Sequence, residues 1–459
     1  MDAKMNAISK KALKIQLRNK ASIAFSSTLF MLLNIAVDII LCIYYDTASI
    51  LVADIIYTSL ILIYASKVEN VPLGVLFLGK VLAVCYAVIQ CYCYESMYGN
   101  LYYVGGSDDL YFEQSANLMI SKGMIWPWEF LKIEPLSNYS GFVAFLALHM
   151  RIVNLVSDYH SFSFIVVNIN IWLFSSLIVL NYLNRHIGKE RSNIICFIIL
   201  LFFPNAIYIT THVFRDTLCG CLILISFTLL DRNNKSKYKY ILLTFTTVFA
   251  FFVRMESAII IVCILFASFL KNEMSKSKRI LLLLTIAAII FALAYVVGVW
   301  NYSIDKYSRY VVYTTSTENK IINALYGMPL LPFGLIARCL YGLVSPLPTG
   351  IFEIAEMFSN YYSFRNVFVS IGIIGQIICL PFLFKRILRI DYMAISFLII
   401  YMSNRLVTSG FRHIILSYPL MFMLIYEEMY SINPVKRKNI LIFSFLGLCF
   451  LGIIFILLF

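Results

Sequence analysis

The chain has 459 residues, of which 61% are hydrophobic and only 13% are charged, and its mean hydropathy is +0.84. A soluble domain carries roughly 25% charged residues, so this composition excludes a soluble globular protein and predicts an all-α, multi-pass membrane protein. The net charge of +13 fits loops that face an anionic cytoplasmic leaflet. We therefore expect membrane lipids and no nucleic acid as partners.

Apolar stretches that could form membrane helices follow one another along the chain. They lie at 26–45, 49–65, 71–92, 162–184, 193–210, 215–231, 240–254, 257–270, 279–300, 366–385, 390–403, 413–428 and 438–459. Two further stretches, 141–156 and 327–346, could cross the membrane, re-enter it or lie along its surface. The sequence predicts about 13 transmembrane helices in one integral membrane domain, residues 1–459.

Lysine and arginine indicate the orientation of these helices. If 141–156 and 327–346 do not cross, the N-terminal run "MDAKMNAISKKALKIQLRNK" and the basic loops "NRHIGKER" and "KNEMSKSKR" all face the cytoplasm, as the positive-inside rule requires. The outer side then holds two long loops, 93–161 and 301–365. Eight arginines, the outer arginine set, also lie on this predicted outer side, and their guanidinium groups could contact phosphate or lipid headgroups. They are Arg151, Arg215, Arg254, Arg309, Arg338, Arg365, Arg405 and Arg412.

The first outer loop contains "GGSDDLYFEQSANLMISKG", residues 105–123. Asp108 and Asp109 are adjacent, and repelling carboxylates tend to retain a proton unless a cation lies nearby. Such a pair could supply a general base or half of a divalent-metal site. Alternatively, one aspartate caps a short juxtamembrane helix.

Shorter outer turns carry further ionisable residues. "THVFRD" places His212, Arg215 and Asp216 at a predicted helix start, where Asp216 could serve only as a favourable N-terminal charge. "FFVRMES" places Arg254 and Glu256 in a tight turn, where they could form a local ion pair.

The segment "NRLVTSGFRHIILSYP" gathers cations at another predicted helix start. Arg405, Arg412 and His413 would form an anion site there by charge and by helix dipole. The alternative is that the arginine side chains extend to the membrane interface.

The acidic segment resembles the first external loop of integral-membrane glycosyltransferases of the GT-C fold. The matching residues are the acidic pair Asp108 and Asp109, then Tyr111, Ala116 and a helix-closing Gly123. "EPLSNYSGFVAFLALHM", "LLFFPNAIYITTHVFRDTL", "FFVRMESAIII" and "FRHIILSYPLMFML" are similar to later segments of that family, in the same order and on the same predicted side. The resemblance covers about residues 100–430. Two additional helices precede the acidic loop.

This resemblance implies an inverting transfer from a polyprenyl-phosphate or polyprenyl-diphosphate sugar at the outer face of the bacterial inner membrane. Bacterial O-antigen and exopolysaccharide polymerases have similar size and composition, and other polysaccharide-assembly proteins would be partners. Asp109 would act as the base or metal ligand, supported by Asp108. Arg215, Arg254, Arg405, Arg412 and His413 would hold the phosphates, with Tyr111, Asp216, Glu256 and His212 in supporting roles.

Two other functions stay open from the sequence. A lipid-glycan flippase or other transporter would use charged residues within the bilayer, and Asp38 and Asp54 lie inside predicted spans. A non-catalytic assembly scaffold would not need the outer arginines.

Overall fold

The structure is a computed structural model. It describes residues 25–101, 108–134, 139–188, 192–231, 236–269, 320–407 and 410–458, with a few single residues between these ranges. All regular secondary structure in these ranges is helical, which confirms the all-α class. The basic N-terminal run and the predicted helix 279–300 lie outside the described residues, as does most of 301–319.

Five helices of the described ranges are long and apolar enough to cross a membrane. They are Phe25–Tyr45, α3 (Leu73–Tyr98), α7 (Ser161–His186), the stretch Leu335–Glu356 formed by α16 and η2, and α17 (Tyr361–Ile387). Counting α8 (Asn193–Leu201) and α9 (Pro204–Thr210) as one broken span gives six. Several shorter apolar helices occur as well, and thirteen crossings remain a prediction.

The chain divides into two compact units. The first comprises Met1–Ile125, Phe145–Phe202 and Thr210–Val213, and the second comprises Trp126–Ala144, Phe203–Ile209 and Phe214–Phe459. Whether the chain forms one membrane domain remains a prediction.

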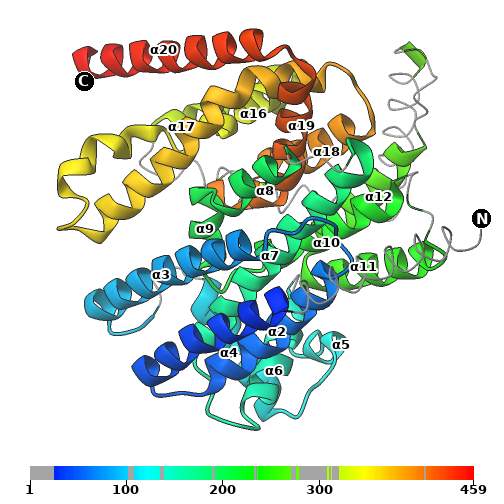
Figure 1. Cartoon of the computed structure of the whole chain (residues 1–459), viewed down its shortest axis with the longest axis vertical. Helices are drawn as coiled ribbons and strands as arrows, with labels where there is room; N and C mark the ends of the chain where they lie inside the picture. Colours follow the sequence, from blue (N-terminus) through cyan, green and yellow to red (C-terminus); the bar gives the residue numbers. More distant parts are fainter. Residues whose placement is uncertain are drawn as a thin grey trace, which may run out of the picture. The chain divides into compact units, whose positions relative to one another are not determined.

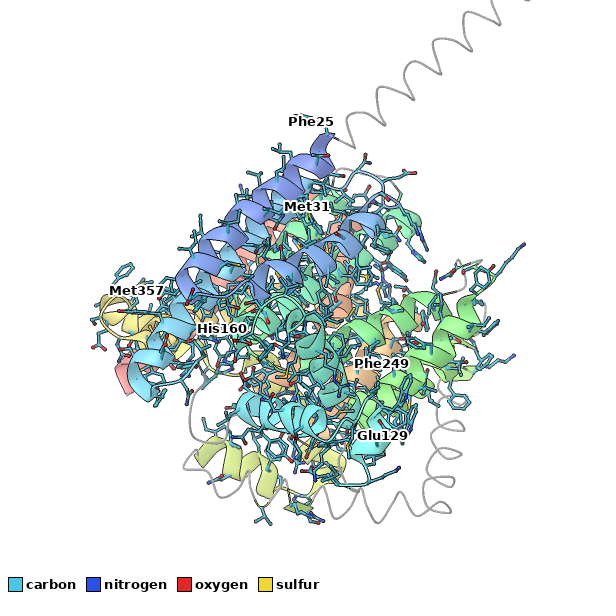
Figure 2. All side chains as sticks on the ribbon, turned by 90° about the horizontal axis from the view of Figure 1, so that it is seen from below. Phe25, Met31, Glu129, His160, Phe249 and Met357 are labelled. Carbon is cyan, nitrogen blue, oxygen red and sulfur yellow. The ribbon has the colours of Figure 1, made fainter. Side chains whose placement is uncertain are left out.

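In the first unit, α7 is the central helix, and α2 (Ser49–Ala65) and α3 pack against it (Figure 1). Apolar residues occur on all of its faces, which is typical of a helix that is buried all round, and 94% of its most apolar window is buried. The helix Phe25–Tyr45 begins this unit, and Figure 2 labels Phe25 and Met31 in its first turns.

In the second unit, α10 (Asp216–Leu230) packs against α11 (Lys239–Val253), α12 (Met255–Ser268) and η3 (Phe411–Leu416). α12 contacts α18 (Tyr392–Val407), and α17 contacts α19 (Tyr418–Ser431) and α20 (Pro434–Leu458). Ion pairs join the end of α17 to α19, because Arg386 lies 2.6 Å from Glu427 and Arg389 pairs with the fully buried Glu428.

A close backbone contact in the second unit explains Gly141, the second residue of α6 (Ser140–Val153). A Cβ atom there would lie 2.7 Å from the Phe252 carbonyl carbon and 2.8 Å from the Val253 nitrogen. Backbone atoms cannot rotate away, so we expect Gly141→Ala to lower the free energy of unfolding by about 1–3 kcal/mol. Thermal unfolding in detergent measures this. Gly447→Ala in α20 is the control, because no atom lies within 4 Å of its Cβ position. A Gly141→Ala variant with the stability of the unmodified protein would contradict the close contact.

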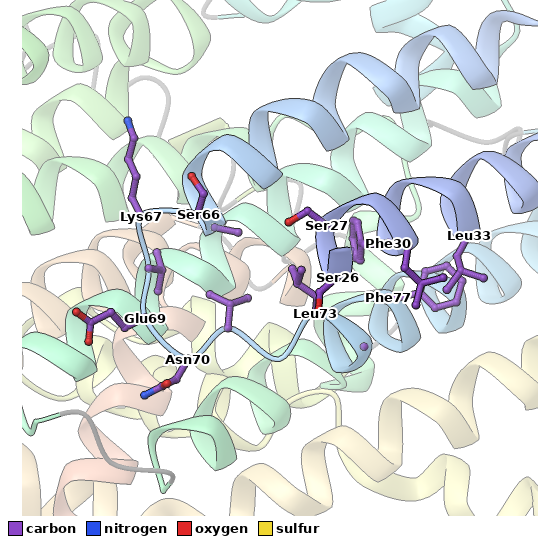
Figure 3. A pocket seen from close by; sticks show the side chains of 15 residues that line it. Ser26, Ser27, Phe30, Leu33, Ser66, Lys67, Glu69, Asn70, Leu73 and Phe77 are labelled. Atoms are coloured by element: carbon purple, nitrogen blue, oxygen red, sulfur yellow. The ribbon is translucent and has the colours of Figure 1, made fainter. Parts of the chain in front are cut away.

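A cavity of about 820 Å³ lies in the first unit, at the turn between α2 and α3 (Figure 3). Lys67, Glu69 and Asn70 line it, together with Ser27 and Phe77. Under the orientation predicted from the sequence, this turn would face the cytoplasm. Leu73 is the first residue of α3, and Gln90 lies about 25 Å further along this helix at 1.5 Å per residue. The cavity is therefore distant from the polar contacts of Gln90.

Candidate functional site

The acidic pair begins a helix, as predicted. α4 runs from Asp108 to Ser121 with both aspartates in its first turn, where the helix dipole favours negative charge. The chain leaves the helix through Gly123, whose φ of +68° suits glycine. Asp108 is half-buried and Asp109 is only 2% exposed. Oδ2 of Asp109 accepts a hydrogen bond of 3.2 Å from the Val213 N–H, so this carboxylate binds backbone outside its own helix.

Glu113, one turn further along α4, fixes the orientation of the helix. It accepts a hydrogen bond from the Tyr159 hydroxyl and a second one of 3.0 Å from the Ser161 hydroxyl. Burial, reinforced by the Glu113 charge, raises the pKa of Tyr159 well above its usual range, so Tyr159 stays a protonated donor. The structure therefore gives Glu113 a positioning role, while Tyr111 is exposed.

Side chains of the first unit also hold the segment 210–213. Gln90 Nε2 donates to the Thr211 carbonyl at 3.0 Å, and Asn168 Nδ2 donates to the His212 carbonyl at 2.6 Å. The His212 ring is buried, 6.5 Å from the Tyr94 ring between centroids. Gln90 and Asn168 were not predicted, although an amide inside an apolar helix is a usable signal.

In the second unit, Asp216 is the centre of a charged cluster. It is the first residue of α10 and is 2% exposed. Its Oδ1 accepts a hydrogen bond of 2.8 Å from Arg254 Nη1 and lies 2.9 Å from His413 Nδ1. Its Oδ2 lies 3.7 Å from Nε of Arg412. The three turns that the sequence predicts on the outer side thus contribute to one cluster.

Two more predicted residues extend this cluster. Glu256 Oε2 lies 3.7 Å from Arg254 Nε. Arg215 Nη1 donates to the Val253 carbonyl at 3.3 Å, directly before Arg254 in the chain, and its guanidinium lies 5.9 Å from the Tyr139 ring centroid.

The charges of the cluster do not cancel. Burial lowers the pKa of His413 to about 4, so its ring is neutral at pH 7 and donates to Asp216 when Nδ1 carries the proton. Three guanidinium groups then face two carboxylates, which leaves an excess of positive charge suited to an anion. Arg412 is the most accessible of the partners of Asp216, with 31% of its side chain exposed, and it lies over the Phe214 ring at 4.5 Å.

Arg405 has a different environment from the other predicted phosphate ligands. It lies in α18, is 2% exposed and donates from Nη2 to the Gly410 carbonyl at 3.1 Å. Its contacts hold the segment that leads to Arg412. Arg338, from the same outer arginine set, is buried too and donates to the carbonyls of Leu406 and Tyr326 at 3.1 Å each.

A metal-binding cluster would need three or more His, Cys, Asp or Glu side chains close together. The part of the chain that the structure describes contains no such cluster. A divalent metal at Asp108 and Asp109 remains a prediction, and it would need further ligands from the substrate.

Residues 111–310 match the model of the Alg9-like mannosyltransferase family. The match covers less than half of the chain, and it includes Asp216, Arg254 and Glu256 but neither the acidic pair nor Arg412 and His413. No curated protein and no solved structure matches the chain.

Proposed function

We propose that this chain, which is a membrane glycosyltransferase of the GT-C type, takes its sugar from a polyprenyl-phosphate or polyprenyl-diphosphate donor. Undecaprenyl is the polyprenyl chain we expect, and the reaction takes place at the outer face of the bacterial inner membrane. The product enters a surface polysaccharide, an O-antigen or exopolysaccharide. The excess of lysine and arginine in the predicted cytoplasmic loops supports this orientation.

The cluster around Asp216 is the observation that carries the proposal. In it, Arg412, Arg254 and Arg215 bind the donor phosphate, and Asp216 together with His413 holds Arg254 in place. Charge-assisted hydrogen bonds to an oxyanion are about twice as strong as neutral ones. They also stabilise the negative charge that grows on a phosphate leaving group. Arg405 contributes by fixing the segment before Arg412.

Asp109 is the proposed general base. The acceptor hydroxyl attacks the anomeric carbon, and Asp109 takes the proton of that hydroxyl as the new C–O bond forms. The bond from the anomeric carbon to the phosphate oxygen breaks, and its electron pair leaves with the polyprenyl phosphate. One displacement inverts the anomeric configuration.

The first experiment uses the purified full chain in lipid nanodiscs. The matched family is described as mannosyltransferases, so the first donor is polyprenyl-phosphate mannose with labelled sugar, and the acceptor is a lipid-linked oligosaccharide. We expect labelled product and free polyprenyl phosphate in equal amounts. Equal activity with a nucleotide sugar and no polyprenyl donor would refute the donor class. If the protein moves a lipid-linked glycan across the liposome membrane and forms no transfer product, the flippase alternative is favoured.

A cellular experiment separates polymerisation from the addition of one sugar. Deletion of the gene is expected to remove the long chains of the polysaccharide ladder if the enzyme joins repeat units. A uniform shift of every band by one sugar would instead indicate a single-sugar transferase.

A further inference from the structure

Two exposed tryptophans form a stacked pair in the second unit. Trp126 directly precedes the short helix α5 (Pro127–Phe130), and Trp128 lies within it. Their ring centroids are 5.0 Å apart and their planes differ by 5°, yet the two residues are 53% and 50% exposed. Carbon atoms in contact are about 3.5–4.0 Å apart, so the indoles are offset and neither ring fully covers the other. The pair therefore presents a flat aromatic surface, which the functions assigned above do not use.

Local contacts fix the turn that carries this pair. The Trp126 N–H donates to Glu129 Oε2 at 2.8 Å, and the Glu129 N–H donates to the Trp126 carbonyl at 3.0 Å. Pro127 is the first residue of α5, where its restricted φ suits a helix start. Phe130 ends α5 and is fully buried. Since the fold already orders the turn, a ligand that binds there has little ordering entropy to overcome.

The same turn packs next to the charged cluster around Asp216. The Trp128 and Phe252 rings lie 6.3 Å apart between centroids, and Phe252 is two residues before Arg254 in the chain. Consecutive Cα atoms are 3.8 Å apart, so those of Phe252 and Arg254 are separated by at most about 7.6 Å. All these residues belong to the second unit. A short saccharide can therefore extend from the cluster to the aromatic pair.

The chemistry of the pair fits a sugar ring. The face of an indole carries partial negative charge from its π-electrons, and one face of a pyranose presents C–H bonds with partial positive charge. Glu129 adds an acceptor for sugar hydroxyl groups, because a carboxylate has about four acceptor positions and the Trp126 N–H occupies one of them. Tryptophan also occurs at membrane interfaces, but a carboxylate in contact with the pair repels lipid phosphate.

We propose that Trp126 and Trp128 bind a sugar ring of the acceptor oligosaccharide, an inference that rests on the proposed function. The donor carries its sugar directly on the phosphate that the arginines bind, so it does not need the aromatic pair. The acceptor has further sugars behind its reacting hydroxyl, and stacking of one of them on the pair positions that hydroxyl. The pair thereby selects acceptors that are long enough to reach it.

Transfer kinetics of the full chain in nanodiscs test this site. Trp126→Ala is expected to raise the KM for the lipid-linked oligosaccharide acceptor by about 2- to 12-fold, the usual effect of losing one aromatic contact. The kcat and the KM for the donor should not change. Trp126→Phe should keep most of the acceptor affinity, because a phenyl ring can still stack on a sugar.

Tyr240→Ala is the matched control. Tyr240 is also an exposed aromatic residue, but it lies at the start of α11, at the opposite end of this helix from Phe252, so its loss should leave the acceptor KM unchanged. An unchanged acceptor KM in Trp126→Ala, or an equal loss in Trp126→Phe, would overturn the proposal.

A binding measurement without catalysis separates this inference from the proposed function. In saturation-transfer NMR, a soluble mannose trisaccharide should receive signal from the unmodified protein and lose it with Trp126→Ala. Binding without any transfer from a polyprenyl donor would support the sugar site and refute the proposed function. No signal from the unmodified protein would overturn the sugar site.

Fluorescence with brominated lipids tests whether the pair instead lies in the membrane interface. We expect the lipids to quench the unmodified protein and the double variant Trp126→Phe, Trp128→Phe to the same extent. Quenching that only the unmodified protein shows would place the pair in lipid and overturn the proposal.

Discussion

Asp109→Asn is expected to lower kcat for sugar transfer by about 100- to 10,000-fold, the usual contribution of a general base. The amide oxygen of asparagine can still accept the Val213 N–H, so the position of α4 is kept while the proton acceptor is lost. The measurement is single-turnover transfer from the polyprenyl-phosphate donor, with donor affinity measured separately. We expect affinity to change little, because the base acts on the acceptor hydroxyl.

Two controls make this result specific. Asp231→Asn replaces the same residue type at the far end of α10 and should keep activity. Glu113→Gln should produce an intermediate loss, because it weakens the contacts with Tyr159 and Ser161 that orient α4. Full activity in a correctly folded Asp109→Asn variant would remove this residue from the mechanism.

Hydropathy located most helices of the described ranges but not all of their ends. The stretch 49–65 coincides with α2, since both ends are set by apolar composition. By contrast, 71–92 underestimates α3, which continues through the polar residues up to Tyr98 and ends where Gly99 adopts a φ of +69°. A bilayer-length criterion detects the apolar part of a helix and misses a polar extension into the aqueous phase.

The interruption of 193–210 has a local cause that the sequence contains. Pro204 has no N–H for a preceding turn and disfavours helical conformation at Phe203, so α8 ends at Leu201 and α9 begins at the proline. Similarly, the stretch 413–428 begins as the short 3₁₀ helix η3, and α19 starts only at Tyr418, with Pro419 in its first turn.

The members of the charged cluster around Asp216 could be named from the sequence, but their arrangement could not. Arg254, Arg412 and His413 were predicted as ligands because the predicted topology places them on the same side of the membrane. That Asp216 is their common partner depends on contacts between residues far apart in the chain, which no local pattern encodes. The partner of Lys80 could not be predicted from a local pattern either, because Asp54 lies on another helix.

Arg412→Ala is expected to lower kcat/KM for the polyprenyl-phosphate donor by about 100- to 1,000-fold, the effect typical of losing one donor to a developing oxyanion. Arg412 is the partner of Asp216 with the most exposed side chain, so its loss disturbs the buried Asp216–Arg254 pair least. Arg412→Lys should recover only part of the activity, because an ammonium group cannot contact phosphate in bidentate fashion. Arg437→Ala in α20 is the control and should keep activity.

The double variant Asp109→Asn, Arg412→Ala tests whether the two residues act in the same step. Residues that stabilise one transition state are non-additive, so the double variant should lose less activity than the product of the two single effects. Strictly multiplicative losses would mean that Arg412 acts on donor binding alone, independently of Asp109.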